Sequence, residues 1–333
     1  MNGENSQNRT NPFDHIYKIC NSGNSQSKLL NLPEFPNIID IELTNICNFN
    51  CLMCPTGTKS IKRKQGFMHR DIFFKLLNEI EKYKTPIRFI RWGEPLLHSN
   101  LIEFIKETKN RRLMCHLNTN GSYINDEYIN AFIDIPLDSI KFSFQGIDRK
   151  SYNEMRNTDF YEDLLIIIEK LYKKRNSGQF PFIHVATTIT YEDSNQVQVF
   201  KSRLKPISDY ISVGRTCLEH IDVHKVKLGA DEKERLKWLK NQETVIKKHP
   251  ECPEVFDKLS INWDGTVSAC CGDYDNKMIV GDMKVNSLKK IWHSKKLNYY
   301  RKILAKMDHD KLPLCKTCYD YNSLGTPSLQ RTD

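Results

Sequence analysis

The sequence has 333 residues, of which 39% are hydrophobic and 27% are charged. This composition is ordinary for a globular protein that buries a sizeable core. The first 27 residues lack the apolar stretch of a signal peptide, and no aliphatic run could cross a bilayer, so we expect a cytoplasmic protein without a membrane partner. The formal net charge is +9, but Lys and Arg are interspersed with 41 acidic residues, which argues against nucleic acid as a partner.

From about residue 36, short apolar runs alternate with amphipathic helical patterns, which is typical of a parallel sheet built from strand–helix units. The predicted strands are residues 38–43, 87–92, 114–118, 139–144, 183–189 and 210–213. The predicted helices between them are residues 71–83, 101–110, 125–133, 160–175 and 195–204. Six such units predict an α/β fold, namely a partial (β/α)6 barrel of the TIM type.

A smaller α+β unit is predicted to follow the barrel. Residues 230–249 have the pattern of a charged surface helix that ends before Pro250. Residues 258–269 alternate apolar and polar side chains about Asp264-Gly265, which indicates a hairpin, and residues 287–306 have helical spacing. The expected division is a partly flexible N-terminal extension (1–35), the barrel (36–225), a linker helix (226–250), the small domain (251–321) and a loose tail (322–333).

Eleven cysteines are the most informative residues in the chain. A reducing compartment disfavours disulfides, the number is odd, and most of the cysteines fall into two groups. Metal ligation therefore explains them better than disulfide pairing does.

The first cysteine group comprises Cys47, Cys51 and Cys54, directly after the first predicted strand. Closed structural sites normally use four protein ligands, so three thiolates would leave one iron of a cubane cluster open to a reactant. The alternative is a structural zinc loop that borrows a distant fourth ligand.

This loop resembles the CxxxCxxC motif of the radical-SAM superfamily, with Met53 where the family often has an aromatic residue. The resemblance implies that the three cysteines bind a 4Fe-4S cluster. It also implies that the amino and carboxylate groups of S-adenosylmethionine chelate the open iron, and that a 5′-deoxyadenosyl radical forms when this cofactor is reductively cleaved.

Four later segments resemble motifs of the same superfamily. Gly93-Glu94-Pro95 is similar to the GGEP segment, with Trp92 in place of the first glycine, and Asn118-Thr119-Asn120-Gly121 is similar to the TNG turn. Ser143-Phe144-Gln145-Gly146 is similar to SxDG, although Gln145 replaces the acid, and Tyr152 with Arg156 fits Y-x-x-x-R. The resemblance implies that S-adenosylmethionine is bound by Gly93, Glu94, Pro95, Asn118, Ser143, Gln145 and Arg156.

The second cysteine group comprises Cys252, Cys270, Cys315 and Cys318. Four thiolates make a closed site that suits either a cubane cluster or zinc. The region resembles the SPASM family in its shortened Twitch form, which implies one auxiliary 4Fe-4S cluster, and the cysteine spacing is similar to that of aminocyclitol dehydrogenases of the superfamily. Cys271 is an alternative ligand to Cys270.

An auxiliary cluster with four protein ligands cannot bind substrate, so its expected task is to accept an electron during dehydrogenation of an alcohol carbon. Cys217, after the sixth predicted strand, is a candidate hydrogen donor of the kind that an epimerase needs, and the alternative is a buried hydrophobic thiol. Arg215, Glu219 and His220 are candidates for substrate contact or proton removal, with surface or hinge roles as the alternative.

We therefore expect a radical-SAM oxidoreductase, of dehydrogenase or epimerase type, that acts on a small polyol, aminocyclitol or sugar-type molecule. An external reductant such as flavodoxin or ferredoxin is the expected partner. One alternative is a SPASM-type peptide maturase, against which the short segment before the barrel argues, because many maturases carry a leader-binding domain there. The other is a non-catalytic metal-binding partner protein.

Overall fold

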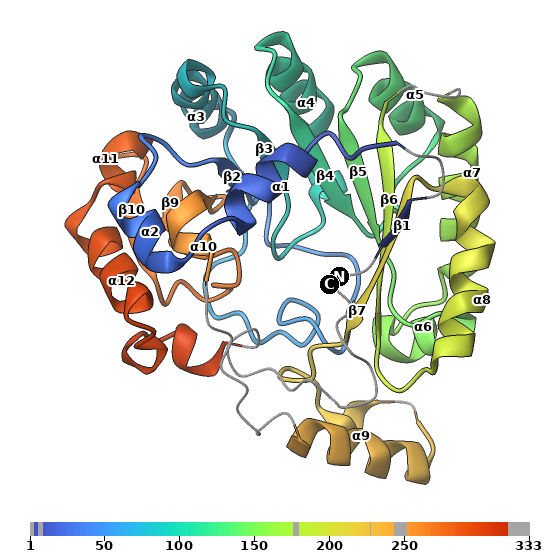
Figure 1. Ribbon diagram of the computed structural model, residues 1–333. Helices are drawn as coiled ribbons and strands as arrows, with labels where there is room; N and C mark the ends of the chain where they lie inside the picture. Colours follow the sequence, from blue (N-terminus) through green and yellow to red (C-terminus); the bar gives the residue numbers. More distant parts are fainter. Residues whose placement is uncertain (1–2, 6–8, 176–179, 227, 243–251, 319–333) are drawn as a thin grey trace.

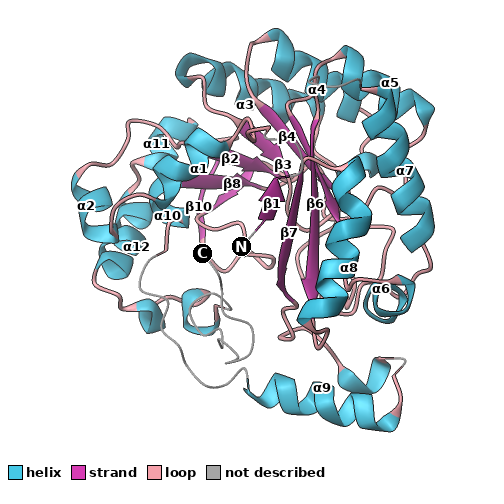
Figure 2. Ribbon diagram, turned by 45° about the vertical axis from the view of Figure 1, so that its right-hand side comes forward, coloured by secondary structure: helices cyan, strands magenta, loops and turns pink. Residues whose placement is uncertain are grey.

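The computed structural model describes residues 3–5, 9–175, 180–226, 228–242 and 252–318. Within these residues, ten strands form one sheet in the order β1-β7-β6-β5-β4-β3-β2-β8-β9-β10 (Figures 1 and 2). The strands are β1 (Gly3–Asn5), β2 (Ile38–Ile41), β3 (Ile87–Phe89), β4 (Cys115–Thr119), β5 (Ser139–Ser143), β6 (Phe182–Ile189), β7 (Tyr210–Arg215), β8 (Lys258–Ile261), β9 (Thr266–Ser268) and β10 (Ile279–Asp282). The helices are α1 (Asp14–Asn21), α2 (Ser25–Leu30), α3 (Arg70–Tyr83), α4 (Leu101–Asn110), α5 (Asp126–Asp134), α6 (Arg149–Arg156), α7 (Tyr161–Lys174), α8 (Ser194–Leu204), α9 (Ala230–Gln242), α10 (Glu254–Asp257), α11 (Leu288–Trp292) and α12 (Lys295–Ala305).

The predicted partial barrel is confirmed. Strands β2 to β7 are parallel neighbours, and helices α3, α4, α5, α7 and α8 cover their outer side (Figure 1). The main difference is that β3 ends at Phe89, three residues earlier than predicted, because the chain turns at Arg91, whose φ is 109°. No helix in the described part of the chain is long and apolar enough to span a membrane.

The hydrophobic core lies between the sheet and the outer helices. Helix α3 buries Phe73, Leu76, Leu77 and Ile80 at helical spacing. The ring of Phe73 stacks on that of Phe104 from α4, with the ring centroids 3.9 Å apart. Burial of each such side chain stabilises the fold by about 1.5–3 kcal/mol.

The inner face of the barrel is polar, because successive strand residues point to opposite sides of the sheet. In β5, Ile140 and Phe142 are fully buried on the helix side, whereas Ser139, Lys141 and Ser143 alternate with them on the inner side. Helix α1 crosses the amino ends of the strands (Figure 1), where the Phe13 ring contacts the ring of His116.

The C-terminal segment extends the barrel sheet. Strand β8 pairs in parallel with β2, and β9 returns antiparallel after a turn at Gly265, whose φ is +85°. The predicted hairpin is thus confirmed. The pairing of β8 with β2 could not be predicted, because no sequence pattern indicates which distant strands become neighbours. The proposed division of the chain into domains stays a prediction.

Two other features differ from the sequence expectations. The helix expected over residues 287–306 is two helices, because Ser294 caps α12 by accepting a hydrogen bond from the Leu297 amide. Helices α1 and α2 and strand β10 were not predicted. Helix α2 contacts α12 through Gln26, whose side-chain amide donates a hydrogen bond to the Ala305 carbonyl at 3.4 Å. Helix α9 lies beyond the carboxyl ends of β6 and β7 (Figure 2), where Glu232 pairs with Lys150 of α6 at 3.1 Å. The end of its predicted range, 243–249, and the tail, 322–333, lie outside the described residues.

Candidate active site

The loop that carries the first cysteine group follows β2 and is held by its own backbone. The Cys54 amide donates to the Cys51 carbonyl at 3.2 Å, and the Leu52 amide donates to the Met155 carbonyl of α6 at 2.8 Å. A Cβ at Gly57 would lie 2.3 Å from the Cys51 carbonyl oxygen, so only glycine allows the loop to close this tightly. The loop is therefore tightly folded by backbone contacts close to its three cysteines.

The three thiols are shielded from water and face hydrogen-bond donors. The Cys47 sulfur accepts from the Phe49 amide at 3.5 Å and from the Asn120 side-chain amide at 3.9 Å. Burial raises the pKa of Cys47 to about 12 and also raises the pKa of Cys54, because a lone thiolate is poorly solvated there. Unoxidised thiols in this setting fit an iron–sulfur cluster, whose irons would supply the missing positive charge.

Arg156 brings a cation to this loop. It ends α6, a helix whose sequence signal is the capping box between Asp148 and Ser151, which was not recognised at the sequence level. Its guanidinium donates to the Cys51 sulfur at 3.5 Å, to the Phe144 carbonyl at 3.2 Å and to the Ser143 carbonyl. Arg156 thus joins the cysteine loop to the end of β5.

Gly93-Glu94-Pro95 lies against the same loop. A Cβ at Gly93 would lie 2.0 Å from the Thr44 carbonyl oxygen, and the Glu94 amide donates to the Ile46 carbonyl at 2.9 Å. The Glu94 carboxylate is buried and accepts from the Thr119 hydroxyl at 2.7 Å and from the Asn120 amide at 2.8 Å. Burial raises its pKa, and these hydrogen bonds oppose that shift. Glu94 therefore fixes the turn after β4 relative to the cysteine loop.

Two further candidates, Asn118 and Gln145, contact polar side chains of the sheet. The Asn118 side-chain oxygen lies 2.8 Å from Nε2 of His116. The Gln145 amide nitrogen donates to the Thr188 carbonyl at 3.0 Å and to the Thr216 hydroxyl at 2.6 Å, and its oxygen accepts from the Thr188 hydroxyl at 2.5 Å. Gln145 thus ties the ends of β5, β6 and β7 together. The contact of both residues with S-adenosylmethionine stays a prediction.

The structure brings the second cysteine group together from three segments. Cys252 precedes α10, Cys270 follows β9, and Cys315 and Cys318 lie at the end of the described chain. Burial raises the pKa of Cys252, and the neighbouring Glu254, Cys315 and Cys318 raise it further. Cys315 has its pKa raised to about 12, again mainly by burial. All four thiols, Cys315 buried and the other three partly buried, lie on the wall of one cavity, which fits a fully ligated iron–sulfur cluster.

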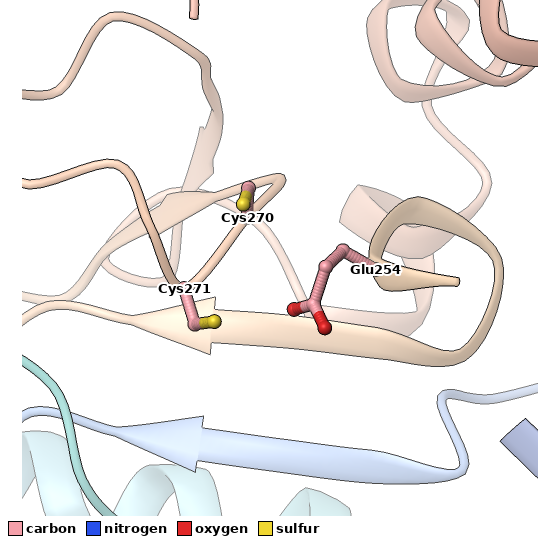
Figure 3. Close-up of side chains that lie close together, drawn as sticks. All are labelled: Glu254, Cys270 and Cys271. Carbon is pink, nitrogen blue, oxygen red and sulfur yellow. The ribbon is translucent and has the colours of Figure 1, made fainter. Parts of the chain in front are cut away.

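Glu254 is a neighbour of this group that no sequence motif singles out. Among the described residues, it forms with Cys270 and Cys271 the set whose ligand atoms all lie within 4.8 Å of one another (Figure 3). One carboxylate oxygen accepts from Lys258, and the other is buried without a partner in the described chain. The Cys270 sulfur accepts from the Gly272 amide at 3.3 Å, and the choice between Cys270 and Cys271 as ligand stays open.

One cavity of about 740 Å³ joins the two cysteine groups. Its wall includes Cys54 of the first group, the whole of the second group, Cys271 and the partly buried Cys217. Three aromatic rings of the cavity wall contact one another. The Tyr274 ring packs edge-on against the Trp92 ring, with centroids 5.7 Å apart, and against the His220 ring, with centroids 5.0 Å apart. Trp92 and Tyr274 are wall residues that sequence reasoning missed, since no motif marks an aromatic residue as part of a cavity wall.

Comparison with protein families gives two matches. Residues 41–196 match the radical SAM superfamily, and residues 252–319 match SPASM, an iron–sulfur cluster-binding domain. The first match contains the three thiols of the first group and the segments round Glu94, Gln145 and Arg156. The second contains all four thiols of the second group.

Curated relatives differ in how much of their length is matched. The chain is 21% identical, over 85% of its length and 92% of the relative, to the S-adenosyl-L-methionine-dependent 2-deoxy-scyllo-inosamine dehydrogenase of Niallia circulans. It is 30% identical, over 31% of its length, to the tungsten-containing aldehyde ferredoxin oxidoreductase cofactor-modifying protein of Pyrococcus furiosus, of which the match spans 29%. It spans 40% of the uncharacterized protein MJ0804 of Methanocaldococcus jannaschii, at 31% identity.

Solved structures show the same fold. BtrN in complex with AdoMet and 2-DOIA matches with a TM-score of 0.56 and 18% identity, over 90% of this chain and 96% of that one. Streptococcus suis SuiB bound to the precursor peptide SuiA matches with a TM-score of 0.63 and 13% identity, over 83% of this chain and 69% of that one.

The two family matches imply S-adenosylmethionine and 4Fe-4S clusters as cofactors, and the buried thiols fit them. The chain belongs to the radical SAM superfamily and is a radical SAM enzyme with a SPASM-type iron–sulfur domain.

Proposed function

We propose that the protein removes a hydrogen atom from a carbon of a small polyol, aminocyclitol or sugar-type substrate, leading to dehydrogenation or epimerisation. The observation that carries this proposal is the cavity of about 740 Å³ whose wall includes Cys54 of the first group, the second group and Cys217. The auxiliary cluster would fill the part beside the second group, which leaves the part beside Cys54 and Cys217 for a small molecule. The dehydrogenase of Niallia circulans, matched over most of both chains, supports the same reaction class.

In this proposal, Cys47, Cys51 and Cys54 hold the first cluster, and Cys252, Cys270, Cys315 and Cys318 hold the auxiliary cluster. When bound, the first cluster and S-adenosylmethionine supply the 5′-deoxyadenosyl radical that abstracts hydrogen, and the auxiliary cluster supplies an acceptor for an electron from the substrate. An external reductant such as flavodoxin or ferredoxin delivers the starting electron. Residues of the cavity wall, such as Met53, Trp92 and Leu304, exclude the water that so reactive a species would attack.

Proton removal and hydrogen return fall to the loop after β7. The His220 side chain lies in the cavity wall, and burial lowers its pKa, so the neutral ring can accept a substrate proton at pH 7. Glu219 lies 3.9 Å from it and can orient the ring. Cys217, three residues away on the same wall, is positioned to return a hydrogen atom if the outcome is epimerisation.

The deciding experiment is anaerobic incubation of the reconstituted protein with S-adenosylmethionine and dithionite. We expect release of 5′-deoxyadenosine; its absence from protein that holds its full iron content would favour the non-catalytic partner protein instead. Once a substrate is known, the Cys217→Ala variant distinguishes the two reactions. If the wild type makes an epimer, the variant should make a ketone instead. If both proteins make the same ketone, the enzyme is a dehydrogenase.

A peptide maturase is the remaining alternative. The structural likeness to peptide-bound SuiB concerns the fold. Mass spectrometry for a modified peptide, set against analysis of small-molecule products, separates the two classes directly. Location in the cytoplasm stays a prediction.

A further inference from the structure

Three exposed lysines follow the first cysteine group closely in the chain, and the proposed chemistry does not use them. Lys59, Lys62 and Lys64 lie between Cys54 and α3, in a segment that we call the basic loop (residues 59–66). Within the part of the chain that the structure describes, none of the three ammonium groups has an ion-pair partner. Exposed lysines are common on protein surfaces. What sets these apart is where the fold holds them.

Hydrogen bonds join the basic loop to the cysteine loop on both sides. At its start, the Thr58 amide donates to the Cys54 carbonyl at 2.9 Å. Toward its end, the side-chain amide of the buried Asn45 donates to the Lys64 carbonyl at 2.8 Å. Asn45 lies only two residues before Cys47, the first thiol of the group. The basic loop is therefore held close to the residues on both sides of the first cysteine group.

Arg63 anchors the middle of the basic loop. Its side chain donates to the Tyr274 carbonyl at 2.7 Å, and the rest of its guanidinium pairs with both carboxylate oxygens of the buried Glu42. The charge of Arg63 is thus offset inside the protein. Because Tyr274 belongs to the segment that follows Cys270, the basic loop lies where the barrel meets the C-terminal unit.

The basic loop keeps an excess of positive charge. Besides Glu42, which offsets Arg63, the described carboxylate that contacts the loop is Asp275, which accepts from two of its backbone amides at 2.7 and 3.3 Å. Three lysines therefore stand against one carboxylate. Lys277, two residues after Asp275, is also exposed and adds a further cation. A surface of this kind attracts a partner of opposite charge and speeds its association.

We propose that the basic loop is the docking surface for an acidic one-electron donor protein of the flavodoxin type. This inference rests on the proposed function, in which an external reductant delivers the starting electron, and it assigns that delivery to one surface of this chain. The donor loses one electron and the first cluster gains it, so the step needs no further reactant. An electron from a partner seated there has the cysteine loop to cross, because hydrogen bonds join the two segments directly.

Exchange of the reductant tests this surface. Release of 5′-deoxyadenosine by the holoenzyme is measured at low ionic strength with either dithionite or reduced acidic flavodoxin as the electron source. The triple variant Lys59→Glu, Lys62→Glu, Lys64→Glu should lower kcat/KM for flavodoxin by about tenfold or more, because attraction becomes repulsion. Its iron content and its dithionite-driven release should match those of the wild type. An unchanged kcat/KM for flavodoxin would overturn the proposal.

A control variant carries the same change in net charge elsewhere. Lys82, Lys106 and Lys174 are exposed lysines of α3, α4 and α7, the helices that cover the outer side of the barrel. Their replacement by Glu should leave kcat/KM for flavodoxin as in the wild type. An equal loss in both triple variants would overturn the proposal, since total charge and not the basic loop would then govern the encounter. If the first variant loses iron, Gln at the same three positions replaces Glu and should still slow the flavodoxin-driven reaction several-fold.

Direct binding separates the docking surface from the radical chemistry. Biolayer interferometry with oxidised flavodoxin should give a Kd about tenfold weaker for the basic-loop variant than for the wild type and the control. Wild-type affinity should fall steeply as salt rises, because exposed charges are screened. Binding of this pattern without release of 5′-deoxyadenosine by either reductant would support the docking surface and refute the proposed function. Equal, salt-independent binding by all three proteins would overturn the docking surface.

Discussion

The two cysteine groups use the same ligand atom in different electrostatic surroundings. In the first group, the Arg156 guanidinium contacts the Cys51 sulfur, and backbone and side-chain amides point at Cys47. In the second group, the Glu254 carboxylate lies close to Cys270 and Cys271 and is itself paired with Lys258. A cation favours added negative charge and a carboxylate opposes it. The first site therefore offers a cation directly to a sulfur, whereas the carboxylate beside the second group is offset by its own cation.

The groups also differ in how the chain assembles them. The first lies within one short loop, closed by Gly57 and supported by Glu94. The second depends on segments that meet only when β8 pairs with β2 and the hairpin forms. Local spacing therefore defines one site, and tertiary packing defines the other.

The strongest way to break the comparison is to remove a ligand from the first group. Cys47→Ala should reduce release of 5′-deoxyadenosine to the level of protein without clusters, because three thiolates are the minimum that leaves one iron open. The measurement is chromatography after anaerobic incubation with dithionite. Cys115→Ala is the matched control, since that thiol is on β4, is fully buried and belongs to neither group. Undiminished release from Cys47→Ala would refute the ligand assignment.

Removing a ligand from the second group should give a partial loss. Cys252→Ala should lower the iron content from about eight to about four per chain, because one of two four-iron clusters is lost. Substrate-free release of 5′-deoxyadenosine should persist. Metal analysis of the wild type that found about four irons and one zinc would instead assign the second site to zinc.

Sequence reasoning located the barrel and the thiols but missed much of what positions them. Periodicity sufficed for β2 to β7, because a barrel strand buried on its helix side carries a strong apolar signal. It did not locate α6, whose signal is only a capping box, or Glu254, which sits two residues from Cys252 and looks like surface charge. The pairing of Arg88 with Asp40 on the inner face could not be predicted, because it depends on the register between strands.

The buried His116 on β4 has a consequence for stability. Burial lowers the pKa of His116 from 6.5 to about 3, so between these values the unfolded chain binds a proton that the folded protein does not. Stability is therefore present above pH 6.5 and is lost as the pH falls toward 3. At pH 5 the loss from this residue is about 2 kcal/mol.

Urea unfolding at pH 8 and pH 5 measures this contribution. The pH 8 value of each protein serves as its own baseline, so the direct cost of replacing the side chain cancels. His116→Gln should lose about 2 kcal/mol less than the wild type between the two values. Identical losses in the two proteins would show that the His116 ring is hydrated in the folded protein.

The smallest expected effect concerns the Glu94 carboxylate, a support that has no counterpart among the described neighbours of the second group. It accepts from the Thr119 hydroxyl and the Asn120 amide at once, and Thr119 in turn accepts from the Gly121 amide at 2.9 Å. Glu94→Gln keeps the shape but turns an N–H group toward a donor, and such a mismatch costs about 1–3 kcal/mol. Part of that cost should appear as affinity for S-adenosylmethionine that is weaker by about tenfold, measured by equilibrium dialysis of the reconstituted protein.

Thr119→Ser is the control for Glu94→Gln, because it retains the hydroxyl and should bind S-adenosylmethionine nearly as the wild type does. If Glu94→Gln also bound like the wild type, the turn after β4 would be held by its backbone alone, and the first site would owe its geometry entirely to the cysteine loop.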